Sequence, residues 1–373
     1  MKKPPALKGR SDPVFDLLAQ SPHKERLADY LALLKPLDDQ GRYLPFDELR
    51  YRWAPGLSAH ICWALVKKAR TAQYASLLPL GEPVQWGKFM LTPVAHKAIS
   101  AVDRQATTAA LEYMTGRIGE QAHFSYLLND LIEDEAIGSS QLEGAATTTR
   151  VAKDMLKRKR LPRTPDERMV IGNYKMMNFA WEIRDQPLSI ELIAAIHRVG
   201  VEGIDDGQYS PGIFRLRDDV VVQDGEGNTV HTPPLAAGLA SRLQALVKWI
   251  NQTHNDPFHA DYVHPLIKAI SLHFALGYEH PFRDGNGRVA RALFYWFMFK
   301  NDFSALRYIA ISTLLRNAPV KYGRSYLYTE GDDLDLTYFI DFQCSVILRA
   351  VTGFTEVYRK SLTYCGSGLA RES

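Results

Sequence analysis

The strongest constraint on the fold is a pair of apolar helical segments separated by the short polar loop "PFRDGNG". The upstream segment, 264–280, is apolar at helical spacing along a stripe that includes Ile270 and Phe274, which predicts a buried helix. The downstream segment, "RVARALFYWFMF", predicts a second buried helix. The loop must therefore join two core helices.

Most of the remaining chain has helical periodicity. Few helix breakers occur between 92 and 159, which favours helices there. Prolines and glycines concentrate between 79 and 93, which predicts a loop. Residues 212–234 carry β-branched side chains on both sides of "DGEGN", a pattern that predicts a β-hairpin. We therefore expect a mainly α protein with one small β-hairpin.

Composition narrows the partners and the location. The 373 residues contain no run of about 18 apolar residues, so no membrane span is expected. The first residues, "MKKPPALKGRSDPVFDLLAQ", have prolines where a signal peptide needs an apolar stretch, which predicts a cytoplasmic protein. The net charge of +3 is too small to require nucleic acid as a partner.

The polar loop has the composition of an anion site. Gly285 and Gly287 allow the backbone to turn with positive φ. Successive N–H groups in such a turn form a concave nest, and the helix that starts there adds its positive dipole end. Arg288 and Arg291 are three residues apart, so they share one face of the first helical turn. A polyphosphate is the ligand that suits this arrangement.

Two further side chains make the loop reactive. Asp284 would repel phosphate unless Mg²⁺ lies between them, so it is the candidate metal ligand. His280 stands at the mouth of the loop, and an imidazole with an ordinary pKa of about 6.5 can accept a hydroxyl proton at neutral pH. A base, a metal ligand and an anion cradle together indicate nucleophilic attack at phosphorus.

The stretch "HPFRDGNGRVAR" resembles the signature of the Fic family, H-x-F-x-[D/E]-G-N-G-R-x-x-R, at every fixed position. The resemblance implies a helical core with a β-hairpin flap. It also implies a protein adenylyltransferase, which moves AMP from ATP to a Ser, Thr or Tyr hydroxyl of a target protein or of itself and releases pyrophosphate. Residues 212–234 lie where the flap that docks the target by strand addition should be.

The resemblance assigns a role to each residue of the signature. His280 would deprotonate the target hydroxyl, the buried Phe282 would anchor the loop, and Asp284 would hold Mg²⁺ between the α- and β-phosphates. The residues implied to bind ATP are Gly285, Asn286 and Gly287 through their N–H groups, Arg288 and Arg291 at the β- and γ-phosphates, and Tyr322 near the adenine. The family usually has two adjacent tyrosines at that last position, whereas this chain has Tyr-Gly.

A second stretch, "EAIGSSQLEG", is similar to the inhibitory-helix motif of the same family, [S/T]-x-x-x-E-[G/N]. Ser139 and Glu143 are four residues apart and share one helical face. The resemblance implies that Glu143 pairs with Arg291, so that this arginine cannot clamp the γ-phosphate. The implied parts are an N-terminal helical region (1–120), a segment with the inhibitory helix and a basic linker (121–164), a Fic core domain (165–345), and a C-terminal helix and tail (346–373).

Several alternatives stay open at this point. A related branch with lysine at the position of Gly287 acts as a kinase, and some relatives with the inhibitory glutamate also remove AMP from targets. A target-binding or DNA-binding regulator with a vestigial site is the alternative from another class. Basic residues and a possible turn between helices at "APG" in the N-terminal 90 or so residues support it, although they fit a helix-turn-helix poorly. Some relatives control the inhibitory helix through dimer contacts, so a homodimer is also open.

Overall fold

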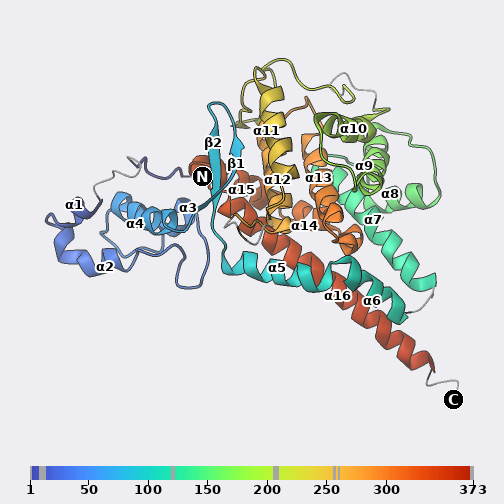
Figure 1. The fold of residues 1–373 in the computed structure, drawn as a ribbon, viewed down its shortest axis with the longest axis horizontal. Helices are drawn as coiled ribbons and strands as arrows, with labels where there is room; N and C mark the ends of the chain where they lie inside the picture. The colour runs from blue at the N-terminus through green and yellow to red at the C-terminus, as the bar shows by residue number, and fades with distance from the viewer. Residues whose placement is uncertain are drawn as a thin grey trace.

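The structure is a computed structural model. It describes residues 2–7, 14–118, 122–204, 210–254, 258 and 261–369, and it describes the side chains within these ranges other than those of 117–131 and 361–369. Helices dominate the described residues, and the strands form two separate antiparallel pairs (Figure 1). The predicted mainly α fold is confirmed. No helix of the described residues has the length and apolar character needed to cross a membrane.

The two apolar segments form α12 (Pro265–Glu279) and α13 (Asn286–Lys300), which lie side by side at the centre of the fold (Figure 1). Nearly every side chain of both helices is buried, with Phe274 and Trp296 fully so. Helix α12 starts at a proline, and its N-cap His264 accepts the backbone N–H of Leu266. The predicted pair of core helices is therefore present.

Other helices surround this pair, and local capping explains where several of them begin. Thr92, Thr148, Thr164 and Ser189 each accept a backbone N–H of the following first turn. The surrounding helices are α5 (Pro93–Gln105), α6 (Thr108–Ile118), α7 (Ala122–Leu142), α8 (Thr149–Lys157), α9 (Pro165–Glu182), α10 (Ile190–Val201), α11 (Leu239–Asn251), α14 (Ile311–Arg316), α15 (Pro319–Gly331) and α16 (Thr337–Leu369), with the 3-10 helix η3 (Ser304–Tyr308).

A close contact between α9 and α10 depends on glycine. A Cβ at Gly172 would lie 2.2 Å from the carbonyl oxygen of Gly200. No side chain fits there, so the two helices approach backbone to backbone. This contact places α10 against the core beside α13.

The loop expected over 79–93 is wrong, because β1 (Ala75–Leu80) and β2 (Gln85–Phe89) form a second hairpin. Leu78, Leu80 and Phe89 are buried against the core, and this burial outweighs the local preference of proline and glycine for loops. The hairpin expected within 212–234 is confirmed but short, with β3 (Val222–Gln223) paired to β4 (Thr229–His231).

The N-terminal region is helical and has small apolar clusters of its own. In Figure 1 it extends to one side of the core. Its elements are α1 (Val14–Leu18), the 3-10 helix η2 (His23–Arg26), α2 (Leu27–Leu31), α3 (Phe46–Leu49) and α4 (Ala59–Thr71).

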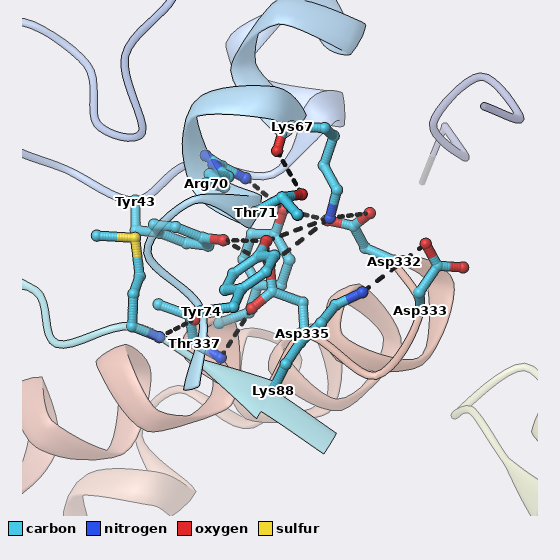
Figure 2. A network of polar contacts seen from close by, with 12 residues as sticks. Tyr43, Lys67, Arg70, Thr71, Tyr74, Lys88, Asp332, Asp333, Asp335 and Thr337 are labelled. Atoms are coloured by element: carbon cyan, nitrogen blue, oxygen red, sulfur yellow. Dashed lines mark hydrogen bonds and ion pairs between the residues drawn. The ribbon is translucent and has the colours of Figure 1, made fainter. Parts of the chain in front are cut away.

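A buried polar network joins this region to the turn between α15 and α16 (Figure 2). The hydroxyl groups of Tyr43 and Tyr74 both donate to one carboxylate oxygen of Asp335, which has no exposed surface. Lys67 of α4 lies 2.9 Å from a carboxylate oxygen of Asp332. Because these groups are removed from water, each depends on its partners for hydrogen bonds.

We predict that Asp335→Asn lowers the free energy of unfolding by about 1–3 kcal/mol, because an amide has one acceptor oxygen where the carboxylate has two, so either the two tyrosine hydroxyls or the N–H of Thr337 loses its acceptor inside the protein. The matched control is Asp333→Asn in the same turn. The side chain of Asp333 is 83% exposed and lies 3.9 Å from Lys88, so this change should cost less than about 0.5 kcal/mol. Urea unfolding of both variants measures the difference, and equal losses would contradict this role of Asp335.

Candidate functional site

The loop between α12 and α13 is closed by its own residues. His280 ends α12 with φ +46°, and Gly285 precedes α13 with φ +79°. The amide of Asn286 spans the loop, because its Oδ1 accepts the N–H of Phe282 and its Nδ2 donates to the carbonyl of Phe282, both at 2.8 Å. Asn286 therefore holds the loop in shape with its side chain, in addition to any contact through its N–H group.

The start of α13 is suited to an anion. The N–H groups of Asn286, Gly287 and Arg288 lie in the first turn, where no intrahelical acceptor exists. The positive end of the helix dipole lies at the same place. The main chain that the sequence predicts to cradle phosphates is therefore arranged at a helix N-terminus.

His280 is held as a neutral base. Its Nδ1 lies 3.2 Å from the carbonyl oxygen of Gly277. A carbonyl only accepts, so Nδ1 carries the hydrogen and Nε2 keeps its lone pair. Burial lowers the pKa of His280 to about 4, and the positive charges of His231 and Arg215 act in the same direction. At neutral pH the ring is therefore uncharged and can accept a proton.

Arg215 fixes the end of α12 and was not singled out from the sequence. Its backbone N–H donates to the carbonyl of Pro281 at 2.8 Å. Its guanidinium donates to the carbonyls of His280 at 2.9 Å and Glu279 at 3.2 Å. A buried cation at the carbonyl end of a helix satisfies free acceptors and opposes the helix dipole. Arg215 ends the sequence "PGIFR" at 211–215, but nothing in that sequence indicates which backbone carbonyls the arginine would bind.

His197 of α10 is a second residue that sequence reasoning missed. It stacks on Phe282 with ring centroids 3.7 Å apart and planes 8° from parallel. Its Nε2 lies 3.1 Å from the carbonyl oxygen of Asp284, and its Nδ1 accepts the N–H of Gly212 at 3.0 Å. A lone histidine in an apolar helix carries no pattern that could have indicated this.

Both predicted arginines are buried beside the loop. Nη1 of Arg288 donates to the carbonyl of Gly200 at 3.3 Å, and a Cβ built on Gly285 would lie 3.3 Å from Arg288 Nη2. Nη1 of Arg291 is buried without a hydrogen-bond partner among the described residues. That nitrogen lies 3.1 Å from where a Cβ of Gly287 would be. A donor of Arg291 therefore faces the start of α13, as an anion ligand there requires.

The other nitrogens of Arg291 bind α7 and the residue just beyond its end. Nε donates to Ser139 Oγ at 2.9 Å, and Nη2 donates to the Ser139 carbonyl at 3.1 Å and to Glu143 Oε1 at 2.8 Å. Burial raises the pKa of Glu143, but the charge and the hydrogen bond of Arg291, together with the charge of Arg288, outweigh it and leave that pKa below its usual value. Glu143 is therefore an anion at neutral pH.

The carboxylate of Glu143 lies directly against the loop. A Cβ on Gly287 would be 2.2 Å from Glu143 Oε1. This negative group thus occupies space next to the N–H groups of the first turn of α13. The structure brings together Ser139, Glu143, His280, Asp284, Gly285, Asn286, Gly287, Arg288 and Arg291.

Asp284 lies in the loop itself, whereas Tyr322 comes from a separate helix. The Asp284 carboxylate accepts the N–H of Gly285 and remains partly exposed at the rim of the loop. Mg²⁺ binds through one or two carboxylates together with substrate phosphates, so this single carboxylate beside an anion seat fits the metal. Tyr322 comes from α15 instead, and its hydroxyl lies 2.8 Å from His273 Nε2 of α12. Its hydroxyl also interacts with the side chain of Arg291, which connects it to the group beside the loop.

Comparisons with known proteins match the segment that contains this loop. Residues 187–298 match the model of the Fic/DOC family. Proteins named protein adenylyltransferase Fic are similar over part of the chain: that of Drosophila ananassae is 32% identical over 111 residues (30% of this chain, 20% of that protein), and that of Drosophila melanogaster is 38% identical over 106 residues (28% and 19%). Each match spans about a fifth of the relative.

Solved structures share the fold. A Fic family protein from Desulfovibrio desulfuricans G20 has a TM-score of 0.56 at 21% identity, covering 72% of this chain and 76% of that one. Fic-1 (aa134–508) from C. elegans has a TM-score of 0.51 at 17% identity, covering 93% and 92%. The fold is a helical core of the kind seen in these Fic structures, with the loop between α12 and α13 at its centre. Residues 187–298 of this chain are a Fic/DOC family domain, as the signature predicts.

We predict that Glu143→Gly tightens the binding of ATP with Mg²⁺ by about 10- to 100-fold, because it removes the carboxylate that pairs with Arg291 and repels phosphate, an effect of about 1.4–2.8 kcal/mol. Isothermal titration calorimetry measures the change. Glu112→Gly, which removes an exposed glutamate from α6, is the matched control and should bind ATP like the parent protein. Unchanged affinity in the Glu143 variant would remove the inhibitory role of Glu143.

Proposed function

We propose that this protein is a protein adenylyltransferase, which transfers AMP from ATP to a Ser, Thr or Tyr hydroxyl of a target protein or of itself and releases pyrophosphate. The observation that carries the proposal is the placement of a neutral imidazole, His280, at the end of α12 beside the anion seat at the start of α13. The Fic/DOC domain and the relatives named as adenylyltransferases support the same reaction.

In this proposal the triphosphate lies along the start of α13. The N–H groups of Asn286 and Gly287 donate to it, and that of Gly285 joins them once the Asp284 carboxylate, which accepts it in the free protein, turns to Mg²⁺. Arg288 and Arg291 bind its outer phosphates with their guanidinium groups. Asp284 would hold Mg²⁺, which when bound supplies positive charge that offsets the developing charge on the phosphates. This anchoring leaves the α-phosphorus nearest to His280.

The transfer then needs one proton acceptor. Nε2 of His280 takes the proton of the target hydroxyl, and the hydroxyl oxygen forms a bond to the α-phosphorus of ATP. The bond between that phosphorus and the α–β bridging oxygen breaks, and pyrophosphate leaves with the electron pair. The loop N–H groups stabilise the charge that develops on the phosphoryl oxygens.

Gly287 supports transfer of AMP rather than of the γ-phosphate. Without a side chain at Gly287, the Glu143 carboxylate lies 2.2 Å from where a Cβ would be, and outer phosphates could occupy that space once this carboxylate moves away. A lysine there would fill it. A kinase reaction or the removal of AMP from targets would use the same base and the same loop, so the transferred group has to be measured.

The neighbouring segments suggest how the reaction is controlled and directed. We infer that Glu143 restrains the enzyme through its pair with Arg291. We also infer that 212–234 docks the target, because Leu216 of this segment is 88% exposed and the β3–β4 pair forms a sheet of only two strands among the described residues. A homodimer and a cytoplasmic location stay predictions from the sequence.

We predict that Glu143→Gly protein incubated with Mg²⁺ takes up label from α-labelled ATP and none from γ-labelled ATP, and that adding His280→Ala reduces uptake at least about 100-fold through loss of the base. Mass spectrometry of the products identifies the transferred group as AMP. Label from the γ-position would indicate a kinase instead, and full activity of the His280→Ala protein would contradict the base assignment.

A pH dependence follows from the environment of His280. Its pKa is lowered to about 4, so the base is already deprotonated well below neutral pH. We predict that kcat/KM of the Glu143→Gly enzyme is flat from about pH 5.5 to 8, with any ascending limb at lower pH. Excess magnesium keeps the nucleotide in one ionic form during the measurement. An ascending limb centred near the ordinary histidine pKa of about 6.5 would contradict the burial argument.

A further inference from the structure

His197 touches three parts of the site that come from different elements. From α10 it reaches the carbonyl of Asp284 with Nε2 at 3.1 Å, the N–H of Gly212 with Nδ1 at 3.0 Å, and the ring of Phe282 by stacking at 3.7 Å. Its side chain is buried. The histidine therefore lies between the loop after α12 and the base of the 212–234 segment.

These contacts fix the hydrogen positions on the ring. The N–H of Gly212 can only donate, so Nδ1 is the acceptor and carries no hydrogen. The carbonyl of Asp284 can only accept, so Nε2 carries the hydrogen and donates it. Both polar atoms of the buried ring are satisfied in one tautomer, and a ring turned over by 180° would satisfy neither.

The carbonyl that His197 holds controls the direction of the next peptide. Asp284 O belongs to the peptide that leads into Gly285, whose φ is +79°. A Cβ on Gly285 would lie 3.3 Å from Cδ2 and Nε2 of His197, so the ring packs against this turn on its far side. Moving the carbonyl would rotate the Asp284 carboxylate and the first N–H groups of α13 together.

We propose that His197 is a positioning residue for nucleotide and metal binding, which sets the Asp284–Gly285 peptide through Nε2 and ties it to the base of the 212–234 segment through Nδ1. The proposal rests on the function proposed above. His197 does not touch the reacting groups, and it acts through the peptide that carries the Asp284 carboxylate.

Two amide substitutions distinguish the role of Nδ1 from the role of Nε2 in His197. In His197→Gln the side-chain amide can stand in for Nε2 and donate to Asp284, whereas in His197→Asn the side-chain oxygen can stand in for Nδ1 and accept from Gly212. His96→Asn, which changes an exposed histidine of α5, is the matched control. All variants are made in the full-length Glu143→Gly protein, and thermal unfolding verifies that each is folded.

The first measurement is hydrogen exchange of the backbone amides of 282–286 without any ligand. We expect His197→Asn to speed exchange there by about 5- to 10-fold, the loss of roughly one hydrogen bond, while His197→Gln and His96→Asn stay close to the parent. Equal exchange in all folded variants, or equal acceleration in the Gln and Asn variants, would overturn the proposal.

The second measurement is Mn²⁺ binding by calorimetry in the presence of saturating α,β-methylene-ATP. We expect about 10-fold weaker binding in His197→Asn and parent-like binding in His197→Gln. Unchanged Mn²⁺ affinity in a folded His197→Asn protein would overturn the proposal. A parent that transfers no AMP, while its loop exchange still depends on His197, would overturn the proposed function but not the positioning of the loop.

Discussion

The packing of α12 against α13 is the constraint on which the rest of the structure depends. Both helices bury nearly all of their side chains, so they cannot separate without exposing a large apolar area to water. The short link between them is therefore confined to the place where one helix ends and the other begins. His280 lies at the first of these ends, and the N–H groups of the anion seat lie at the second. A single packing contact thus sets the distance between His280 and the N–H groups at the start of α13.

Arg288 and Arg291 are buried cations beside this loop, and groups from other helices offset the cost of burying them. A buried cation without partners is strongly destabilising. Arg288 is turned toward the carbonyl of Gly200, and Arg291 is paired with Ser139 and Glu143. In the absence of a guest anion, Glu143 supplies the negative charge that a phosphate would otherwise bring. If the nucleotide binds as proposed, stability of the free protein and affinity for the nucleotide oppose each other at Arg291.

Segments outside the core are attached mainly by directional polar contacts. The N-terminal region meets the α15–α16 turn through the buried network around Asp335 (Figure 2). The 212–234 segment is held by Gly212 on His197, by Arg215 on the end of α12, and by His231, whose ring nitrogens lie 2.7 Å from Glu330 and 2.8 Å from the carbonyl of Tyr278. Such contacts fix the position of the segment but bury little apolar surface. Movement of this segment would therefore shift the end of α12, where His280 lies.

The residue pattern was sufficient to predict the two core helices and the short loop that joins them, because the signature lies within one short stretch between two apolar segments. It did not predict the β1–β2 hairpin, where burial against the core overrides proline and glycine. It also missed His197 and Arg215, because their partners are backbone carbonyls and N–H groups, which every residue has and no side-chain pattern marks. Only the folded chain decides which of these identical groups lies within reach, since that depends on how distant helices pack.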